Sequence, residues 1–528
     1  MRFSRAERLF AALVGGVLLL YALVSIVVRP AMFSDSAFGF LVWDSMVRGA
    51  GFNQLVGPNP ADIAHDTAEF LTTWSPGQYI FPGLLETLGL PLGVAIALVT
   101  TIFAAAGLAG WYALYRTFGF PVRTVMIATT ITLFARHLTL SFGIYTGGEI
   151  LLFGLAGWFI LLAWHLRELL WRAVPILIFA SMVLIFAKLS GLILAAIVIG
   201  AVATYDVKLP VQRGTSRKLA VASVTIALMG VAFYVAWFSR GWSVLTPATG
   251  LQWSQLVPSA ALAIAASWGG GASLCDLVHF VFLHPGRPLL KSATPIYLAM
   301  IPLALATFWL MARRLRTEYG SYLRFTALVC ATFSAVMVVM WLRGAEIELE
   351  ERHFRVPALL LLVGIVHAFI SVPSRPVRAA FALVVTLGGL YGVASFANHA
   401  SAALRHPLGI RGFRHDVISA PVLDLVHAID RDAKGNGSPP IILVPTPELG
   451  LEIRQARLIH THVDFETPER IRQRVWHGRV PKLFVILQSR MVSNGKAALT
   501  LRAFADIPAS KWRMVPIDSE FVLFTAQD

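Results

Sequence analysis

The sequence is poor in charge and nearly free of cysteine. Only 14% of its 528 residues are charged, whereas 57% are hydrophobic, a balance that excludes a soluble protein of several domains. Of the two cysteines, Cys275 and Cys330, the second falls inside an apolar run, so no disulfide framework is indicated. Internal repeats are also missing, and nothing therefore favours the inverted-repeat plan of many transporters.

Long apolar runs are what the chain has in abundance. A run of about 17 to 22 apolar residues matches the roughly 30 Å of hydrocarbon that a helix must cross. Eleven segments predict transmembrane helices near 9–28, 92–114, 122–138, 149–164, 173–187, 190–204, 219–238, 294–312, 325–342, 357–372 and 379–396. The first has no small-residue cleavage site before Arg29 and Pro30, which favours an uncleaved span over a signal peptide.

Positive charge alternates between the short loops that join these segments. Lysine and arginine are retained on the cytoplasmic side, so the loops rich in them are predicted to lie inside. These segments contain Arg2, Arg5 and Arg8, Arg116 and Arg123, Arg167 and Arg172, Lys208 to Lys218, Arg313 to Arg324, and Arg375 and Arg378. We expect a bacterial inner-membrane protein with a cytoplasmic amino terminus and an external carboxyl end. The same cations account for much of the net charge of +15, so nucleic-acid binding is not expected.

The hydropathy falls to soluble levels from about Asn398. Three apolar runs beyond this point predict buried strands, and two other stretches predict helices. They are 441–446, 483–488 and 521–526 for the strands, and 466–476 and 496–504 for the helices. The predicted fold class is an α-helical polytopic membrane protein with about eleven transmembrane helices, which form a transmembrane domain over 1–397, and a soluble, external α/β domain over 398–528.

The first outer loop, 29–91, is expected to carry two amphipathic helices. Ser34 or Asp35 can cap a helix over 36–48, whose apolar residues recur at three- and four-residue spacing and should lie on the bilayer surface. Prolines in and around SPGQYIFPG indicate a short juxtamembrane helix before the second span. Trp74 and Tyr79 belong at headgroup depth.

Three acidic residues on the outer side are candidates for chemistry. Asp35 lies near the outer headgroup plane, where a carboxylate is costly to desolvate unless it is paired; the alternative is that it only caps the helix. Asp44 belongs to the same helix and is as readily explained by a solvated face. Glu149 opens the fourth span, where a carboxylate also complements the helix dipole.

Cations at the outer ends of spans are the second candidate group. Arginines on this side are not needed for topology, and their planar pairs of donors suit phosphate oxygens. Lys188 lies in a tight connection between two spans, where snorkelling is the alternative. The candidates for phosphate binding are Lys188, Arg352, Arg355, His353, Arg136 and His137.

A metal site is less well supported. Glu346, Glu348, Glu350 and Glu351 supply oxygen ligands that Asp35 could join, but their spacing is neither that of a zinc site nor that of a calcium loop. The cofactor is therefore left open between a divalent metal ion and none. No nucleotide or organic cofactor is expected, because no glycine-rich phosphate cradle is present.

The order of these features resembles the GT-C glycosyltransferases, multispanning enzymes that use polyprenyl-phosphate-linked sugars, among them lipid A aminoarabinose transferase and the protein mannosyltransferases. The likeness rests on FSDSAFGFLVWDSMVRG directly after the first span, WSPGQY at 74–79, YTGGE at 145–149 and RHFRVP at 352–357. It covers about the first 400 residues.

The resemblance implies a role for each candidate. The family's first-loop acid is the catalytic base, which would be Asp35, with Glu149 and Asp44 as further catalytic candidates. Cations would stabilise the leaving phosphate. Substrate-lining candidates from these motifs are Trp74, Tyr79 and Tyr145. The expected partners are a polyprenyl-phosphate-linked donor, a lipid, glycan or protein acceptor, and membrane lipids. Many relatives have two consecutive acids where this chain has one aspartate, which leaves metal dependence open.

Two other functions fit a membrane architecture. A transporter would place ionisable residues within spans, whereas these interiors are nearly bare, with His367 the clearest exception. An O-antigen ligase or polymerase also uses a lipid-linked glycan but depends on a large late outer loop rich in arginine and histidine, for which the 239–293 loop is a modest candidate. The main prediction is therefore a glycosyltransferase that acts in the synthesis of cell-envelope glycans.

Overall fold

The structure is a computed structural model whose chain divides into two compact units. It describes residues 4–169, 171–207, 213–240, 250–283, 288–345, 347–434, 439–460 and 466–527. Arg2, Lys208 and Glu346 lie outside these residues. The first unit, here the helical unit, comprises Met1–Ser25, Leu98–Gly143 and Gly148–His399. The second, here the mixed unit, comprises Ile26–Ala97, Ile144–Gly147 and Ala400–Asp528.

All eleven segments predicted to span the membrane are helical, and the helical unit holds most of their length. The helices are α1 (Arg5–Val28), α4 (Leu92–Thr117), α5 (Val122–Phe134) with α6 (Arg136–Thr139), α7 (Gly148–His165), α8 (Ala173–Ala187), α9 (Gly191–Thr204), α10 (Arg213–Ala236), α13 (Thr294–Leu315), α14 (Gly320–Leu342), α15 (Arg355–Ile370) and α16 (Arg375–Ala403). Within the described residues, eight helices are long and apolar enough to cross a membrane, or ten if each of two bent pairs counts as one span. The polytopic fold class is confirmed.

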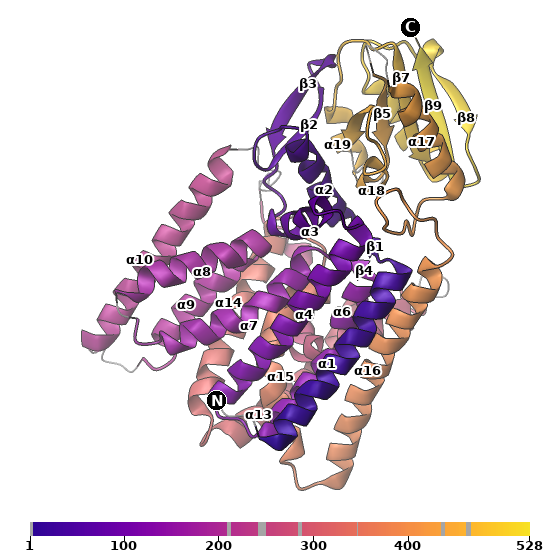
Figure 1. Cartoon of the computed structure of the whole chain (residues 1–528). Coiled ribbons are helices and arrows are strands. Elements are labelled where there is room, and N and C mark those ends of the chain that lie inside the picture. Colours follow the sequence, from indigo (N-terminus) through magenta and orange to yellow (C-terminus); the bar gives the residue numbers. More distant parts are fainter. Residues whose placement is uncertain are drawn as a thin grey trace. The chain divides into compact units, whose positions relative to one another are not determined.

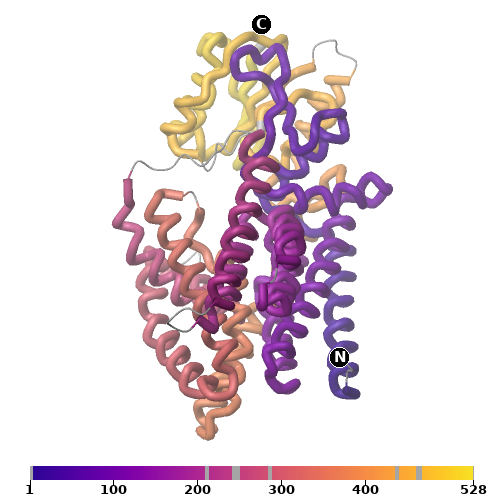
Figure 2. Tube along the Cα trace, turned by 90° about the vertical axis from the view of Figure 1, so that its left-hand side faces the viewer, coloured from indigo at the N-terminus to yellow at the C-terminus, as the bar shows by residue number. Residues whose placement is uncertain are grey.

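Long helices of this unit run alongside one another in two views taken 90° apart (Figures 1 and 2). The rings of Tyr21 in α1 and Phe396 in α16 pack with centroids 5.1 Å apart. Near the opposite end of α1, the Tyr112 hydroxyl of α4 donates a hydrogen bond of 2.7 Å to Glu7. Contacts of both kinds therefore hold α1 against helices that lie far away in sequence.

A bent helix pair occupies much of the 239–293 stretch that we expected to be an outer loop. Helix α11 (Leu256–Gly269), the short η4 (Gly270–Ala272) and α12 (Leu274–Leu283) follow one another, with a 107° bend. The bend coincides with Ser273, whose φ of 53° lies in the left-handed region. A Cβ at Gly271 would lie 3.2 Å from the Ala358 carbonyl oxygen, so glycine permits close contact with α15. Gly269, Gly270 and Gly271 interrupt the apolar sequence between α11 and α12. For this reason hydropathy alone did not indicate the two helices.

The part of the first outer loop in the mixed unit is more enclosed than its sequence suggested. Helix α2 (Ser34–Val47) is buried from Ser36 to Ser45, so it is an internal helix and not the exposed surface helix that we expected. Phe33 is its N-cap residue and no side chain caps it, which overturns the capping roles of Ser34 and Asp35.

The rest of this loop forms a helix and an unpredicted hairpin. Helix α3 (Gly77–Thr87) confirms the predicted short helix before α4. It packs on α2, where a Cβ at Gly83 would lie 2.4 Å from the Trp43 ring. Strands β2 (Gln54–Asn59) and β3 (Asp62–Phe70) pair antiparallel; their exposed, polar residues gave no strand pattern.

The carboxyl-terminal part of the mixed unit is built on a five-stranded mixed sheet, four strands of which are labelled in Figure 1. Its order is β6 (Arg457–His460), β5 (Ile441–Val444), β7 (Lys482–Gln488), β9 (Phe521–Gln527) and β8 (Arg513–Pro516). Strands β6, β5 and β7 are parallel, and β9 is antiparallel to β7 and β8. The three predicted strands are confirmed as β5, β7 and β9. Strands β6 and β8 were missed because each has only two consecutive apolar residues, which lie between an arginine and a histidine or proline.

Helices cover both faces of this sheet. Side chains of a strand alternate between faces, so Ile442 and Val444 pack with Val422 and Val426 of the unpredicted α17 (Ala420–Ala433). On the other face Leu443 packs in a cluster that includes residues of α19 (Pro468–Gln473) and α21 (Lys496–Arg502), which confirm the two predicted helices.

Two short elements join the first loop to the rest of the mixed unit. Strand β1 (Ala31–Met32) pairs in parallel with β4 (Ile144–Tyr145). Helix α18 (Pro447–Gly450) follows β5 and packs on α2, where the Ser34 hydroxyl donates a 2.5 Å hydrogen bond to Glu448. The amino end of α2 is therefore fixed by residues from near and far in sequence.

A buried arginine connects two helices of the same unit. The Arg411 side chain is only 1% exposed and makes ion pairs with both Asp44 of α2 and Glu86 of α3. Its Nη1 lies 2.9 Å from Asp44 Oδ2, and its Nε lies 2.8 Å from Glu86 Oε1. Because one guanidinium serves two carboxylates, it ties the linker after α16 to both first-loop helices.

We predict that Arg411→Ala strongly destabilises the mixed unit. The change leaves two carboxylates without their partner in a buried site, and breaking a buried ion pair in this way costs about 3–5 kcal/mol. Thermal and urea unfolding of the detergent-purified chain measure the loss. Arg431→Ala, at an exposed arginine of α17, is the matched control and should change stability by less than about 0.5 kcal/mol. Equal losses in the two variants would contradict the role of Arg411.

Candidate functional site

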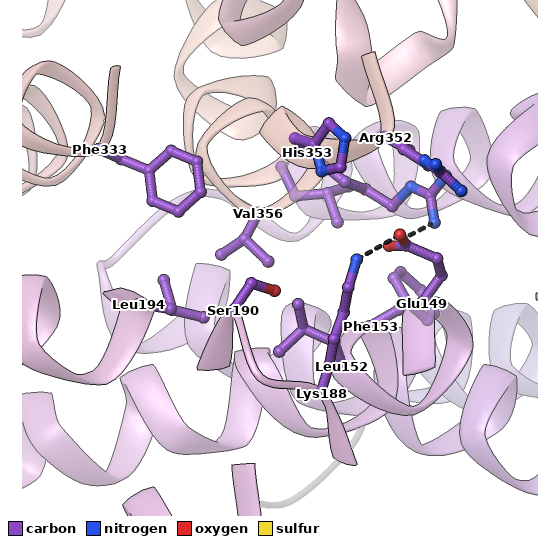
Figure 3. Close-up of a pocket in the computed structure, with 12 residues that line it drawn as sticks. Glu149, Leu152, Phe153, Lys188, Ser190, Leu194, Phe333, Arg352, His353 and Val356 are labelled. Carbon is purple, nitrogen blue, oxygen red and sulfur yellow. Dashed lines mark hydrogen bonds and ion pairs between the residues drawn. The ribbon is translucent and has the colours of Figure 1, made fainter. Parts of the chain in front are cut away.

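The helical unit contains a pocket in which several predicted site residues meet (Figure 3). Its wall is half charged or polar and half apolar. The residues that line it are Glu149, Lys188, Ser190, Arg352, His353 and Arg355 on the polar side, and Leu152, Phe153, Leu194, Phe333, Val356 and Leu359 on the apolar side. Such a wall suits a molecule with an anionic head and a hydrocarbon tail.

A close approach of two glycine-bearing turns places Glu149 beside Lys188. Gly147 has a left-handed φ of 55°, and α7 begins at the next residue. A Cβ at Gly148 would lie 3.0 Å from the Ala187 carbonyl oxygen and 3.2 Å from the Lys188 Cβ. Since no larger residue fits there without a shift, the glycine pair lets the first turn of α7 contact the α8–α9 turn.

The backbone also explains how the cations are positioned. Lys188 follows α8 in an extended conformation, with φ −157° and ψ 136°, so the chain leaves the helix at this residue. Arg352 and His353 belong to the single turn η5 (Glu351–Phe354), and Arg355 begins α15. Three separate chain segments thus deliver their polar side chains to one place.

Glu149 is the partner of two of these cations. Lys188 Nζ donates a hydrogen bond to Glu149 Oε1, and Arg355 Nη1 lies 3.7 Å from Oε2. The three side chains are between 9% and 22% exposed. In this setting an ion pair compensates the cost of removing each charge from water.

Arg352 is paired at the more exposed edge. Its Nε lies 2.6 Å from Glu350 and its Nη2 lies 3.5 Å from Glu348, whose side chains are 46% and 65% exposed. Burial raises the pKa of Glu350 to about 7, although Arg352 opposes the shift. Near neutral pH Glu350 is therefore a weaker partner for Arg352 than a fully ionised glutamate.

Arg136 and His137 are not among the residues that line the pocket. Arg136 Nη1 lies 2.8 Å from Asp276 Oδ2, and His137 Nδ1 lies 3.1 Å from the Ser273 hydroxyl. Glu351 accepts a 2.7 Å hydrogen bond from the Asp276 backbone nitrogen. The two predicted cations thus belong to a neighbouring polar network around the start of α12, which the sequence analysis had taken for a loop.

The remaining predicted residues belong to the mixed unit. Asp35 lies in the first turn of α2. Asp44 is held by Arg411, and burial raises its pKa even though Arg411 opposes the shift. Trp74 stacks on Phe38, with ring centroids 4.9 Å apart.

Both predicted substrate-lining tyrosines are fully buried. The Tyr79 hydroxyl donates a 2.6 Å hydrogen bond to Asn53, and the Tyr145 hydroxyl donates a 2.5 Å hydrogen bond to the Gln78 carbonyl. Their hydroxyls are engaged within the protein, and the substrate-lining role stays a prediction.

Sequence reasoning missed Ser190, Phe333 and Asp276. Ser190 is two residues from Lys188, so the tight connection between the spans was a usable signal for it. Phe333 is one of many apolar residues in α14, and only packing selects it. Among the described residues, no three histidine, cysteine, aspartate or glutamate side chains gather in a way that could hold a metal ion.

No protein-family model and no curated protein sequence matches this chain. Solved structures of ArnT from Cupriavidus metallidurans resemble it over nearly the full length of both chains. The structure bound to undecaprenyl phosphate has a TM-score of 0.53 at 14% identity and covers 97% of each chain. The apo structure has a TM-score of 0.54 at 14% identity and covers 98% of each chain. The chain therefore shares the fold of these ArnT structures over nearly its whole length.

Proposed function

We propose that this protein is an integral membrane glycosyltransferase that moves a sugar from a polyprenyl-phosphate carrier to an acceptor hydroxyl at the outer face of a bacterial inner membrane. One observation carries the proposal: a pocket that joins three cationic side chains to an apolar wall within a bundle of apolar helices. The fold supports it, because one structure of ArnT with this fold holds undecaprenyl phosphate.

The pocket suits the donor's phosphate and the first part of its lipid. Lys188, Arg352 and Arg355 offer fixed donors to phosphate oxygens, while residues such as Leu194 and Phe333 offer an apolar surface to the hydrocarbon. When the glycosidic bond breaks, negative charge develops on the bridging phosphate oxygen. Cations held in place before the reaction stabilise that charge without reorganising, which lowers the barrier.

The general base in this proposal is Asp35. It lies in the first turn of α2, the helix that follows the first span. Asp44, the other aspartate of this helix, is bound to buried Arg411 and is better explained as a structural residue.

The chemical step needs no oxidant or reductant. Asp35 accepts the proton of the acceptor hydroxyl while that oxygen forms a bond to the anomeric carbon of the sugar. The bond from the anomeric carbon to the phosphate oxygen breaks, and its electron pair leaves with polyprenyl phosphate. The products are a glycosylated lipid, glycan or protein and the free lipid phosphate.

We predict that Asp35→Asn abolishes sugar transfer without unfolding the protein. Asparagine fits the same space but cannot accept the proton, and loss of a general base lowers rates by about 10²- to 10⁴-fold. Mass spectrometry of envelope glycolipids and glycans, in cells lacking the gene and complemented with each variant, measures the transfer. Asp62→Asn in the β2–β3 hairpin is the matched control, because asparagine can keep the 3.1 Å hydrogen bond from the Ala64 nitrogen. Full activity of Asp35→Asn would remove the base assignment.

We predict that Lys188→Met and Arg352→Gln each weaken binding of undecaprenyl phosphate by about tenfold or more, since a charge-assisted hydrogen bond contributes roughly 1.5–3 kcal/mol. Binding is measured on the purified full chain by microscale thermophoresis. The control is Lys218→Met, which removes a lysine paired with Glu168 at 3.3 Å outside the pocket. Unchanged affinity in both pocket variants would contradict their phosphate role.

A further inference from the structure

Glu149 is unusual among the residues described as lining the pocket, because it alone carries a carboxylate. Both of its oxygens face cations: Oε1 accepts from Lys188, and Oε2 lies 3.7 Å from Arg355. Its side chain is 9% exposed. A carboxylate held in this way is poorly placed to act as a base, because taking up a proton would break two ion pairs in a site with little water.

The same contacts put Glu149 in competition with an incoming anion. The cations that suit a phosphate are the ones that the carboxylate already holds, so its negative charge offsets part of the attraction that Lys188 and Arg355 would exert on a phosphate. Arg352 differs, because its partners Glu350 and Glu348 lie outside the pocket lining, with side chains 46% and 65% exposed. A partly exposed ion pair contributes less than a buried one.

We propose that Glu149 is an internal counter-ion, which neutralises Lys188 and Arg355 in the empty pocket and gives them up to the phosphate of a bound polyprenyl phosphate. This inference rests on the proposed function and adds a means of ligand exchange to it. The carboxylate keeps two buried cations paired when no ligand is present, so the pocket does not collapse or bind stray anions tightly.

The counter-ion has its largest effect on the product. The donor is a phosphodiester with one negative charge, whereas the product is a phosphomonoester with about −1.5 to −2 charges at pH 7. The cations attract the product more strongly than the donor because its charge is larger, so competition from Glu149 matters most at the step in which the product leaves. Glu149 returns to Lys188 and Arg355 as the lipid phosphate leaves, which favours release and the next turnover.

The test is the affinity of the purified full chain for undecaprenyl phosphate when the competing charge is removed. Glu149→Gln keeps the size of the side chain, and we expect it to raise the affinity by about tenfold while lowering steady-state sugar transfer. Glu149→Asp keeps the charge on a shorter side chain, and we expect an affinity between those of the wild type and Glu149→Gln. Glu168→Gln, at an exposed glutamate of the same unit, changes net charge equally and should leave the affinity unchanged.

Two further ligands identify what the pocket binds. Undecaprenol, which lacks the phosphate, should bind equally to wild type and Glu149→Gln, since the carboxylate competes only with an anion. Inorganic phosphate should show the same preference for Glu149→Gln at much weaker affinity, and a response equal to that of undecaprenyl phosphate would overturn the lipid part of the inference. Thermal unfolding shows whether each variant is folded. If Glu149→Gln does not fold, Glu149→Asp alone provides the test.

The outcomes separate this inference from the proposed function. If undecaprenyl phosphate binds, Lys188→Met weakens it, and both Glu149 variants bind no more tightly than the wild type, then Glu149 only orients the cations and the counter-ion role is wrong. If neither wild type nor any variant binds undecaprenyl phosphate, both the proposed function and this inference fail.

Discussion

The structure depends on one constraint: a charged side chain taken out of water must meet an opposite charge or hydrogen-bonding groups within the protein. Removing an ion from water costs several kcal/mol even after relaxation, and only a well-placed partner compensates for it. The chain has few charged residues, yet it buries Glu149 against Lys188 and Arg355 in the helical unit. It also buries Arg411 against Asp44 and Glu86 in the mixed unit. Each set fixes segments that lie far apart in the sequence.

In the helical unit this constraint produces a pocket whose cations can bind an anion. The close contact at Gly148 brings the start of α7 against the α8–α9 turn, and residues of η5 line the same pocket. The result is a group of cations beside an apolar wall, which is the complement of a lipid phosphate. In the proposed mechanism the same cations pair with Glu149 in the empty pocket and with the phosphate in the bound state. The two states therefore exclude each other.

In the mixed unit the constraint has a structural outcome. Helix α2 carries the candidate base and is enclosed by α3, the β2–β3 hairpin and α18 from the carboxyl-terminal region. Ser34, next to Asp35, is held by Glu448, while Asp44 is held by Arg411. The carboxyl-terminal region is thus more than an appendage, because it supplies two of the side chains that fix the helix bearing the proposed base.

The sequence by itself determined the polytopic helical architecture, three of the five strands of the sheet and the short helix before α4. Hydropathy is a local property, and a continuous apolar run is enough to express it. For Glu149, Lys188 and Arg355, the sequence predicted only that they are candidate site residues at a similar depth in the membrane. Which of them touch, and that Arg136 and His137 turn instead to α12, was decided by tertiary packing. The bent α11–α12 pair, the burial of α2 and the pairing of Asp44 with Arg411 were invisible for the same physical reason: each depends on contacts between segments separated by tens to hundreds of residues, where a glycine or a partner charge in one segment sets the structure of another.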